Sequence, residues 1–405
     1  MPVVARATDF KVIFMLDSYA SLTANWSYPT AIRFGAGRIA ELAEAVGAAG
    51  MQRPLFVTDP GLAGLPVVAG ALSVLEAAGL PHAVFSKVDG NPTLANLEDG
   101  LSAYRAGRHD GVIAFGGGSA MDIGKTIAFM SGQTRPVWDF EDRADWWTRA
   151  DAAGIAPILA VPTTAGTGSE VGRAAVITDP ADHTKKIIFH PKMQPRIVIA
   201  DAELTLGLPP KITAWTGMDA LSHSLEAWSS PFFHPMSQGI ALEGMRLVKE
   251  WLPVAVREGT RVEARASMLI ASSMGAVAFQ KGLGAMHAMS HPCSSLRGTH
   301  HGLTNAVVMP YVLAHNAPLI EEKLAALARY LDLPRHSAAG VIDWVLALRE
   351  ELGIPHTLKE IGVDIDVLPQ AARMAEHDPS TGGNPVPLGV AEYEQLFRNA
   401  IDGRI

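Results

Sequence analysis

The first half of this 405-residue chain alternates short apolar runs with helical stretches. Strands are expected at residues 54–58, 82–86 and 111–115, and helices are expected at 68–79 and 94–107. Alternation at this spacing is typical of βαβ units, whose strands run parallel and whose helices cover the sheet. The pattern therefore restricts the first half of the chain to a parallel, helix-covered α/β sheet of the Rossmann-like kind.

The sequence pattern changes at about Leu204, where the second half of the chain begins. Stretches rich in Ala, Leu and Met replace the strand signals, and helices are expected at 241–256, 264–278, 319–331 and 337–352. Gly207-Leu-Pro-Pro210 marks the expected domain boundary. We therefore expect an α/β domain over residues 1–207, in which 1–26 form an N-terminal extension, followed by an all-helical domain over 208–405.

The composition excludes several classes of protein. Apolar residues make up 48% of the chain and charged residues 18%, which fits a globular protein with a large interior. The net charge of −8 is not gathered in blocks, so no nucleic-acid partner is expected. No apolar run is long enough for a membrane-spanning helix, and Asp17 interrupts the apolar run near the N-terminus. The lone Cys293 allows no internal disulfide, and we expect a cytoplasmic protein.

Two pairs of residues, each spaced four apart, suggest a metal site. Asp219 with His223, and His287 with His291, each lie within a helical pattern, so each pair shares one helix face. Two such helices facing each other, with His301 from the loop beyond, can enclose a divalent cation. A carboxylate with imidazoles favours iron(II) or zinc over magnesium or calcium. The alternative is chance pairing among fourteen histidines that serve only the core.

A glycine-rich turn follows the expected strand at 111–115. Gly116–Lys125 opens a helix, and a helix N-terminus behind glycines can bind a pyrophosphate closely. The usual dinucleotide pattern is incomplete, because Met121 occupies the place of its last glycine. The Walker pattern of ATPases also fails, because the upstream glycine of Gly124-Lys125-Thr126 is one residue too far away. The alternative to phosphate binding is a tight strand–helix turn with no ligand.

Two other segments fit a dinucleotide. Asp59 follows the expected strand at 54–58, where a carboxylate can accept bonds from ribose hydroxyls and repel a 2′-phosphate. Asp59 therefore favours NAD over NADP, although Asp59-Pro60-Gly61 also reads as an ordinary turn. Residues 161–171 are rich in hydroxyls and glycines after an apolar strand, and they can donate hydrogen bonds to a phosphate or a nicotinamide amide.

Taken together, these segments resemble the iron-containing (group III) alcohol dehydrogenase family over residues 27–400. Five ordered motifs at family-like spacing are far more specific than any one of them. The residues that carry the resemblance are Gly116-Gly-Gly-Ser-x-x-Asp122-x-x-Lys125, Pro162-Thr-Thr-x-Gly-Thr-x-Ser-Glu170, Leu208-Pro-Pro-x-x-Thr-Ala-x-Thr-Gly-Met-Asp219-Ala-Leu-x-His223, Gly282-Leu-Gly-x-Met-His287-Ala-Met-Ser-His291-Pro and His301-Gly.

The resemblance implies a role for each site residue. Carried over from the family, the metal ligands are Asp219, His223, His287 and His301. His291 is implied to lie near the nicotinamide and relay a proton rather than bind the metal. The implied dinucleotide contacts are Asp59, Gly117, Gly118, Ser119, Asp122, Lys125, Thr163, Thr164 and Thr167, together with a lysine that is either Lys185 or Lys186.

The activity implied by the resemblance is NAD-linked oxidation of a small alcohol, or reduction of an aldehyde, at Fe²⁺ or Zn²⁺ in an interdomain cleft. A homodimer or higher homo-oligomer is also implied. Two cations depart from the family pattern: Lys281 and Arg297 add positive charge beside the ligand-bearing segments. They raise the alternative of an acidic substrate, such as a semialdehyde or hydroxy acid.

Two other functions remain open from the sequence. A nucleotide-binding protein without redox turnover could hold a structural metal, which would then lack an open coordination position. A metal-dependent lyase or synthase related to dehydroquinate synthase could share the fold. The pattern of one Asp and three His argues against the second alternative.

Overall fold

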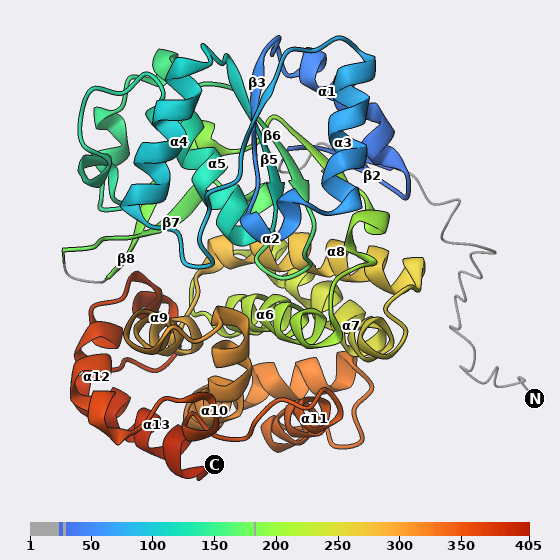
Figure 1. Ribbon diagram of the computed structural model, residues 1–405. Coiled ribbons are helices and arrows are strands. Elements are labelled where there is room, and N and C mark those ends of the chain that lie inside the picture. Colours follow the sequence, from blue (N-terminus) through green and yellow to red (C-terminus); the bar gives the residue numbers. More distant parts are fainter. Residues whose placement is uncertain (1–23, 27–29, 182–183) are drawn as a thin grey trace, which may run out of the picture.

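The protein consists of an α/β half and a helical half, which lie one on the other (Figure 1). The computed structural model describes residues 24–26, 30–181 and 184–405. Most of the expected N-terminal extension therefore lies outside the described residues; only Ala24–Trp26 of it is described, as strand β1. Within the described part of the chain, no helix is both long and apolar enough to cross a membrane.

The α/β half is built on a seven-stranded sheet in the order β1-β2-β9-β6-β5-β3-β4. All neighbouring strands run parallel except β1, which pairs antiparallel with β2. The expected parallel sheet is thus confirmed, although the sequence pattern did not reveal β2 and β9. The strands after β1 are β2 (Ala31–Phe34), β3 (Pro54–Val57), β4 (Ala83–Phe85), β5 (Gly111–Gly116), β6 (Ile158–Pro162) and β9 (Ile197–Ala200).

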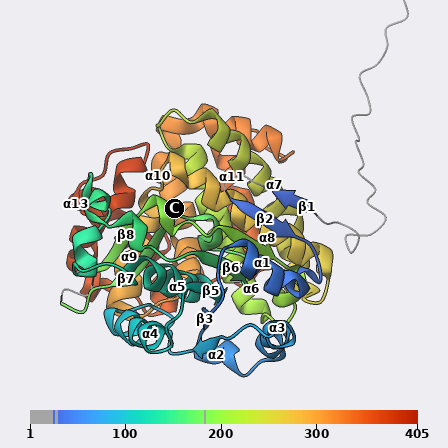
Figure 2. The ribbon, with the colours of Figure 1, turned by 90° about the horizontal axis from the view of Figure 1, so that it is seen from above.

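Helices cover both faces of this sheet, as Figure 2 shows from above. Successive side chains of a strand point to opposite faces. Phe56 and Ile113 pack with α1 and α3, whereas Leu55 and Val112 pack with α4 and α5. Burial on both sides explains why the central strands are apolar throughout. The helices of this half are α1 (Leu42–Ala48), α2 (Pro60–Ala63), α3 (Pro66–Ala77), α4 (Leu94–Ala106) and α5 (Gly118–Met130).

The second half is helical, as expected from its composition. Helix α6 (Pro210–Ser229) lies at its centre and packs against α7, α8 and α10. The expected helix at 319–331 is the end of a much longer helix, α10, which bends at Ile320 shortly after Pro318. The remaining helices are α7 (Pro235–Arg257), α8 (Val262–Ala278), α9 (Ala285–Arg297), α10 (His301–Tyr330), α11 (Ala338–Glu351), α12 (Leu368–Glu376) and α13 (Val390–Asp402).

The strand order places a crevice at a defined edge of the sheet. The chain passes from β3 outward to β4 and then back across to β5 on the other side of β3. Such a reversal leaves a crevice at the carboxyl ends of the two inner strands, where ligands bind in open α/β sheets. Asp59 follows β3 at this edge, and Gly117 follows β5.

Two glycines in the loop after β6 bring the halves into direct contact. A Cβ atom on Gly166 would lie 2.6 Å from the carbonyl oxygen of Thr216 in α6. A Cβ atom on Gly168 would lie 2.3 Å from the Ala276 Cβ in α8, and Gly168 has a φ of +62°. Any larger residue at either position must push the loop away from the helices.

Candidate active site between the two halves

A cavity of about 920 Å³ lies between the carboxyl edge of the sheet and the helical half. It is lined by backbone and side chains from both halves, including the turn that opens α5. Nearly all the expected dinucleotide contacts line it: Asp59, Gly117, Gly118, Ser119, Asp122, Thr163, Thr164, Thr167 and Lys185. Below it is called the large cavity.

The glycines of the phosphate turn are needed for close packing. A Cβ atom on Gly118 would lie 2.6 Å from the Thr167 Oγ1, and one on Gly117 would lie 3.3 Å from the Thr164 side chain. The hydroxyl-rich loop therefore sits directly against the N-terminus of α5. Amide groups at this terminus and the nearby hydroxyls can together hold an anionic diphosphate.

Asp59 has two roles in the structure. Its Oδ1 accepts hydrogen bonds from the amides of Gly61 at 2.9 Å and Leu62 at 3.0 Å, so it caps helix α2. It also lines the large cavity. Asp59 can therefore both cap α2 and bind a ribose, because the cap occupies only one of its two carboxylate oxygens.

Lys125 does not line the large cavity. Its side chain is 1% exposed, and its ammonium donates to Ser169 Oγ at 2.5 Å and to the Ala174 carbonyl. Asp122 completes this network by accepting from the Ser169 hydroxyl at 2.6 Å and from the Val176 amide at 2.9 Å. Because these partners occupy the ammonium, we assign Lys125 to the packing of α5 against β7 (Ala174–Thr178) rather than to the cofactor.

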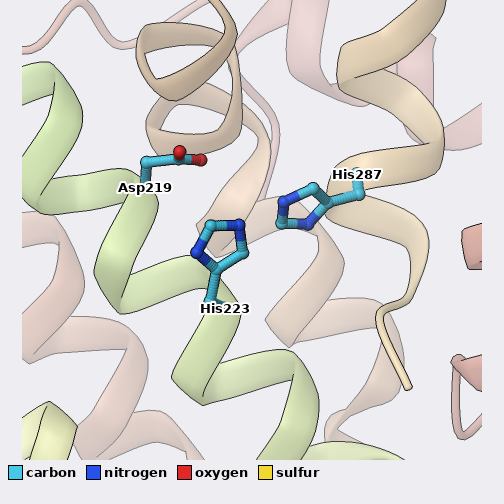
Figure 3. A group of neighbouring side chains, drawn as sticks. All are labelled: Asp219, His223 and His287. Atoms are coloured by element: carbon cyan, nitrogen blue, oxygen red, sulfur yellow. The ribbon is translucent and has the colours of Figure 1, made fainter. Parts of the chain in front are cut away.

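Three of the predicted metal ligands meet in the interior (Figure 3). Asp219 and His223 lie one helical turn apart on α6, and His287 faces them from α9. One ligand atom of each lies within 4.8 Å of the others, and all three residues are buried. A carboxylate and two imidazoles so close together, in an apolar surrounding, form a set that a divalent cation can bind.

His301 stands at the start of α10, beside this group. Its Nε2 lies 3.6 Å from the Asp219 Oδ1, and its ring centroid lies 5.1 Å from that of His287. The position depends on Gly302, where a Cβ atom would lie 2.4 Å from the Trp215 carbonyl oxygen in α6. A residue without a side chain here lets α10 approach α6 and brings His301 to the group.

Sequence reasoning missed Asn305, one turn after His301 in α10. Its Nδ2 donates to the Asp219 Oδ1 at 2.8 Å and lies 3.3 Å and 3.2 Å from Nε2 of His287 and His301. Its Oδ1 is buried without a partner. Three ligand atoms thus converge on one point, which is the arrangement a metal centre requires. The i, i+4 spacing from His301 was the available signal.

Two further residues orient the imidazoles. His287 Nδ1 bonds to Glu226 Oε2 at 2.6 Å, and His301 Nδ1 bonds to the Ser290 hydroxyl at 3.0 Å. With Nδ1 engaged, the Nε2 of each ring points to Asp219 and Asn305. Partners of this kind fix the tautomer of metal-binding histidines. Glu226 also accepts from the Met286 amide, so it ties α6 to the start of α9.

The protonation of two of these three rings suits metal binding, whereas His287 must release a proton to bind a cation. Burial lowers the pKa of His223 to about 4 and lowers that of His301 well below its usual range, so both rings are neutral at pH 7. Burial also disfavours charge on His287, but the Glu226 carboxylate outweighs burial and raises the pKa of His287. Neutral imidazoles offer the lone pairs that a cation needs.

His291 is held by a carboxylate far away in the sequence. Its Nδ1 bonds to Asp378 Oδ2 at 2.7 Å, and its ring stacks on His301 with centroids 5.3 Å apart. His291 lines the large cavity on the side of the metal ligands. Burial opposes ionisation of Asp378, but the neighbouring His291 outweighs burial and lowers the pKa of Asp378. The pair therefore presents Nε2 toward the large cavity.

The structure distinguishes the two candidate lysines of strand β8 (Lys185–Phe189). Lys185 lines the large cavity, whereas Lys186 pairs with Asp179. Burial lowers the pKa of Lys185 to about 8, and the carboxylates of Asp122, Asp219 and Asp378 partly offset this effect. Lys185 is therefore the lysine placed to contact a ligand in the large cavity.

A second cavity of about 420 Å³ adjoins the metal-ligand group and is below called the small cavity. Phe279 lies between the two, because it lines the small cavity and its ring centroid is 5.1 Å from that of His223. Other parts of its wall come from the β7–β8 hairpin, from the end of α8 and from Pro379 and Ser380.

The expectation that Lys281 and Arg297 form an anion site is wrong. Lys281 is 1% exposed, and its ammonium donates to the carbonyls of Ala227 at 2.9 Å and Ser230 at 2.5 Å. It therefore caps the C-terminus of α6, where unpaired carbonyls attract a cation. Arg297 pairs with Asp366.

We expect Lys281→Met to destabilise the protein by about 2 kcal/mol, because hydrogen bonds to a charged group contribute about 1.5–3 kcal/mol. Chemical denaturation followed by circular dichroism measures this change. The comparison variant is Arg297→Met, whose surface ion pair is expected to contribute under about 1 kcal/mol. Equal stability of the two variants would contradict the capping role of Lys281.

Known families match nearly the whole chain. Residues 29–202 match the family described as iron-containing alcohol dehydrogenase, and residues 213–401 match the C-terminal part of the Fe-containing alcohol dehydrogenase family. The two matches correspond to the α/β half and the helical half. They therefore cover both the large cavity and the group of metal-ligand residues.

Individual relatives agree with these matches. A 4-hydroxybutyrate dehydrogenase of Cupriavidus necator is 37% identical over 92% of this chain and 99% of its own length. The crystal structure of a 1,3-propanediol oxidoreductase superposes with a TM-score of 0.85 at 32% identity, over 91% of this chain and 97% of that one. The NAD⁺ complex of a sulfoacetaldehyde reductase from Bifidobacterium kashiwanohense has a TM-score of 0.82 at 28% identity, over 93% and 97%. By these similarities, the chain belongs to the iron-containing alcohol dehydrogenase family.

Proposed function

We propose that this protein is an NAD-linked, iron-dependent dehydrogenase that interconverts a small primary alcohol and its aldehyde, with a short hydroxy acid as the favoured substrate. The observation that carries the proposal is the buried convergence of Asp219, His223 and His287, with His301 beside them, at the edge of the large cavity. The similarity to a 4-hydroxybutyrate dehydrogenase supports the substrate class.

Separate groups of residues serve the metal, the dinucleotide and the proton in this proposal. Asp219 and the three imidazoles would hold a divalent cation, which would supply Lewis-acid stabilisation of an alcohol oxygen, and a bound nicotinamide would supply the hydride acceptor. The turn at Gly118 and the loop residue Thr167 bind the dinucleotide diphosphate. His291 accepts the proton that leaves the alcohol, and its partner Asp378 holds the ring in the orientation for this transfer.

The proposal is tested by reconstituting the protein with iron(II) or zinc and measuring NADH formation over short alcohols, diols and hydroxy acids. Turnover of a primary alcohol that depends on the added metal is the expected result. A metal bound tightly with no turnover of any alcohol or aldehyde would support the other candidate, a nucleotide-binding protein with a structural metal.

We expect the protein to prefer NAD over NADP, and Asp59→Asn to weaken this preference. A 2′-phosphate beside the Asp59 carboxylate meets like-charge repulsion. Asparagine keeps an oxygen that can cap α2, so its effect on the coenzyme is separated from an effect on folding. The measurement is the ratio of kcat/KM for the two coenzymes. An unchanged ratio, or a wild type that prefers NADP, would exclude this role of Asp59.

The proposal also includes the assembly, the compartment and the domain boundary. We infer a homodimer or higher oligomer in the cytoplasm, with a dinucleotide-binding domain over 1–207 and a metal-binding domain over 208–405. Exposed apolar side chains near the start of α7 favour an interface, since Phe233 is 92% exposed and Met236 is 61% exposed. Light scattering after size-exclusion chromatography measures the assembly directly.

A further inference from the structure

We propose that the small cavity is a carboxylate-binding subsite, in which Arg173 receives the acid group of a short hydroxy acid or semialdehyde. The inference rests on the proposed function, because it assigns the far end of the same substrate. The sequence suggested that Lys281 and Arg297 would bind an acidic substrate, but Lys281 caps α6 and Arg297 pairs with Asp366. We assign this role instead to Arg173, which lines the small cavity beside the metal ligands.

One face of the β7–β8 hairpin connects the two cavities. Alternate residues of a strand share a face, so every second residue of the hairpin faces the helical half. In Figure 1 the hairpin lies where the α/β half meets α9. Thr178, Val176 and Lys185 line the large cavity, while Ala174, Ile187 and Phe189 line the small one. Along this face the paired residues are Thr178 with Lys185, Val176 with Ile187, and Ala174 with Phe189. The small cavity therefore continues the groove past Lys185.

Arg173 immediately precedes β7 and also lines the small cavity. Its guanidinium lies 5.5 Å from the ring centroid of Phe189, and its Nη2 donates to the Gln280 Oε1 at 3.4 Å. Among the described residues, no carboxylate oxygen lies within 4.0 Å of it, whereas the neighbouring Arg143 pairs with Glu141. The planar guanidinium keeps its donors available, and it can bind a carboxylate with two parallel hydrogen bonds.

Two neighbouring residues connect the metal ligands with Arg173. Phe279 packs on the His223 ring, and the next residue, Gln280, contacts Arg173. Two consecutive residues of this wall therefore contact a metal ligand on one side and the Arg173 guanidinium on the other. A substrate with its alcohol oxygen at the metal ligands and its carbon chain along this wall would direct its acid group toward Arg173.

A carboxylate in the same cavity gives the inference a second test. Asp142 also lines the small cavity. Burial raises the pKa of Asp142, and the positive charge of Arg173 partly offsets this effect. Asp142 repels an incoming acid group whenever it is ionised. Removing its charge is therefore expected to act in the direction opposite to removing that of Arg173.

The experiment compares 4-hydroxybutyrate with 1,4-butanediol, a neutral substrate of equal carbon length, in the metal-loaded full-length protein. Arg173→Gln is expected to lower kcat/KM for the acid by about tenfold or more relative to the diol, since a charge-assisted pair of this kind has that magnitude. Arg173→Lys keeps the charge but not the fork and should recover part of the loss. Asp142→Asn should raise kcat/KM for the acid.

The matched control is Arg143→Gln, which removes the same charge from an exposed neighbour that pairs with Glu141 and does not line the small cavity. Its ratio of acid to diol should equal that of the wild type. Equal losses on acid and diol in Arg173→Gln would overturn the inference.

A protein that turns over neither substrate would refute the proposed function but would not refute the carboxylate-binding subsite. Calorimetry with butyrate then decides: weaker binding to Arg173→Gln than to wild type supports the subsite, and equal binding refutes it.

Discussion

Replacing His287 by alanine is expected to empty the metal site and to lower turnover by about a thousandfold or more. Lewis-acid stabilisation is worth several kcal/mol, and each 1.4 kcal/mol corresponds to about tenfold in rate. The substitution removes one of the converging ligands and also leaves the Oε2 atom of the buried Glu226 without its partner, although its Oε1 keeps the Met286 amide. Elemental analysis of the purified variant measures the metal, and NADH formation measures the turnover.

Binding of the dinucleotide should survive in this variant, because His287 is not among the residues that line the large cavity. Titration of NADH fluorescence tests this point. The control variant is His377→Ala, whose side chain is 80% exposed and contacts Glu376 and the Arg373 carbonyl of its own helix end. Full metal occupancy in His287→Ala would refute the assignment of the ligand set.

The second large effect is expected at the pair of His291 and Asp378. We expect His291→Ala to lower kcat by about a hundredfold or more while the metal is retained, because a positioned proton acceptor contributes about 10²–10⁴ in rate. Asp378→Asn should lower kcat by about tenfold, because an amide can still hold Nδ1 but does not stabilise a charged ring as a carboxylate does.

The two variants are distinguished from structural damage by the split between kcat and KM. Both should leave KM for the alcohol nearly unchanged, since neither residue is among those that line the small cavity. Metal content and thermal stability serve as controls. A variant of His291 with normal kcat would exclude its role in proton transfer, and a normal kcat in Asp378→Asn would limit Asp378 to packing.

The sheet could be predicted because its signal is local. Central strands buried on both faces are short apolar runs, and they alternate with helices at short intervals along the chain. The strands β2 and β7 escaped notice because partial exposure makes their composition resemble that of loops, whereas β9 escaped notice although it is apolar and buried. Their places are decided by partners more than a hundred residues away for β2 and by a hairpin for β7.

The residues at the candidate site also fall into those with a local sequence signal and those without one. The pairs spaced four apart were visible, because a helix face is a local property. Asp378 was not visible, since it lies 87 residues after His291 and no local pattern joins them. The places of Lys125 and Lys281 could not be predicted for the opposite reason. Each lies close to a motif, but burial turns both side chains toward backbone carbonyls.

The contact made by Gly166 and Gly168 has a consequence for how the two ligands of this protein affect each other. The same loop packs on the phosphate turn through Thr167 and on α6 and α8 through its glycines. Helix α6 carries Asp219 and His223, so any shift of the loop on coenzyme binding would act on two of the proposed cation ligands. Thermodynamic reciprocity then requires that the coenzyme changes the affinity for iron by the same factor by which iron changes the affinity for the coenzyme.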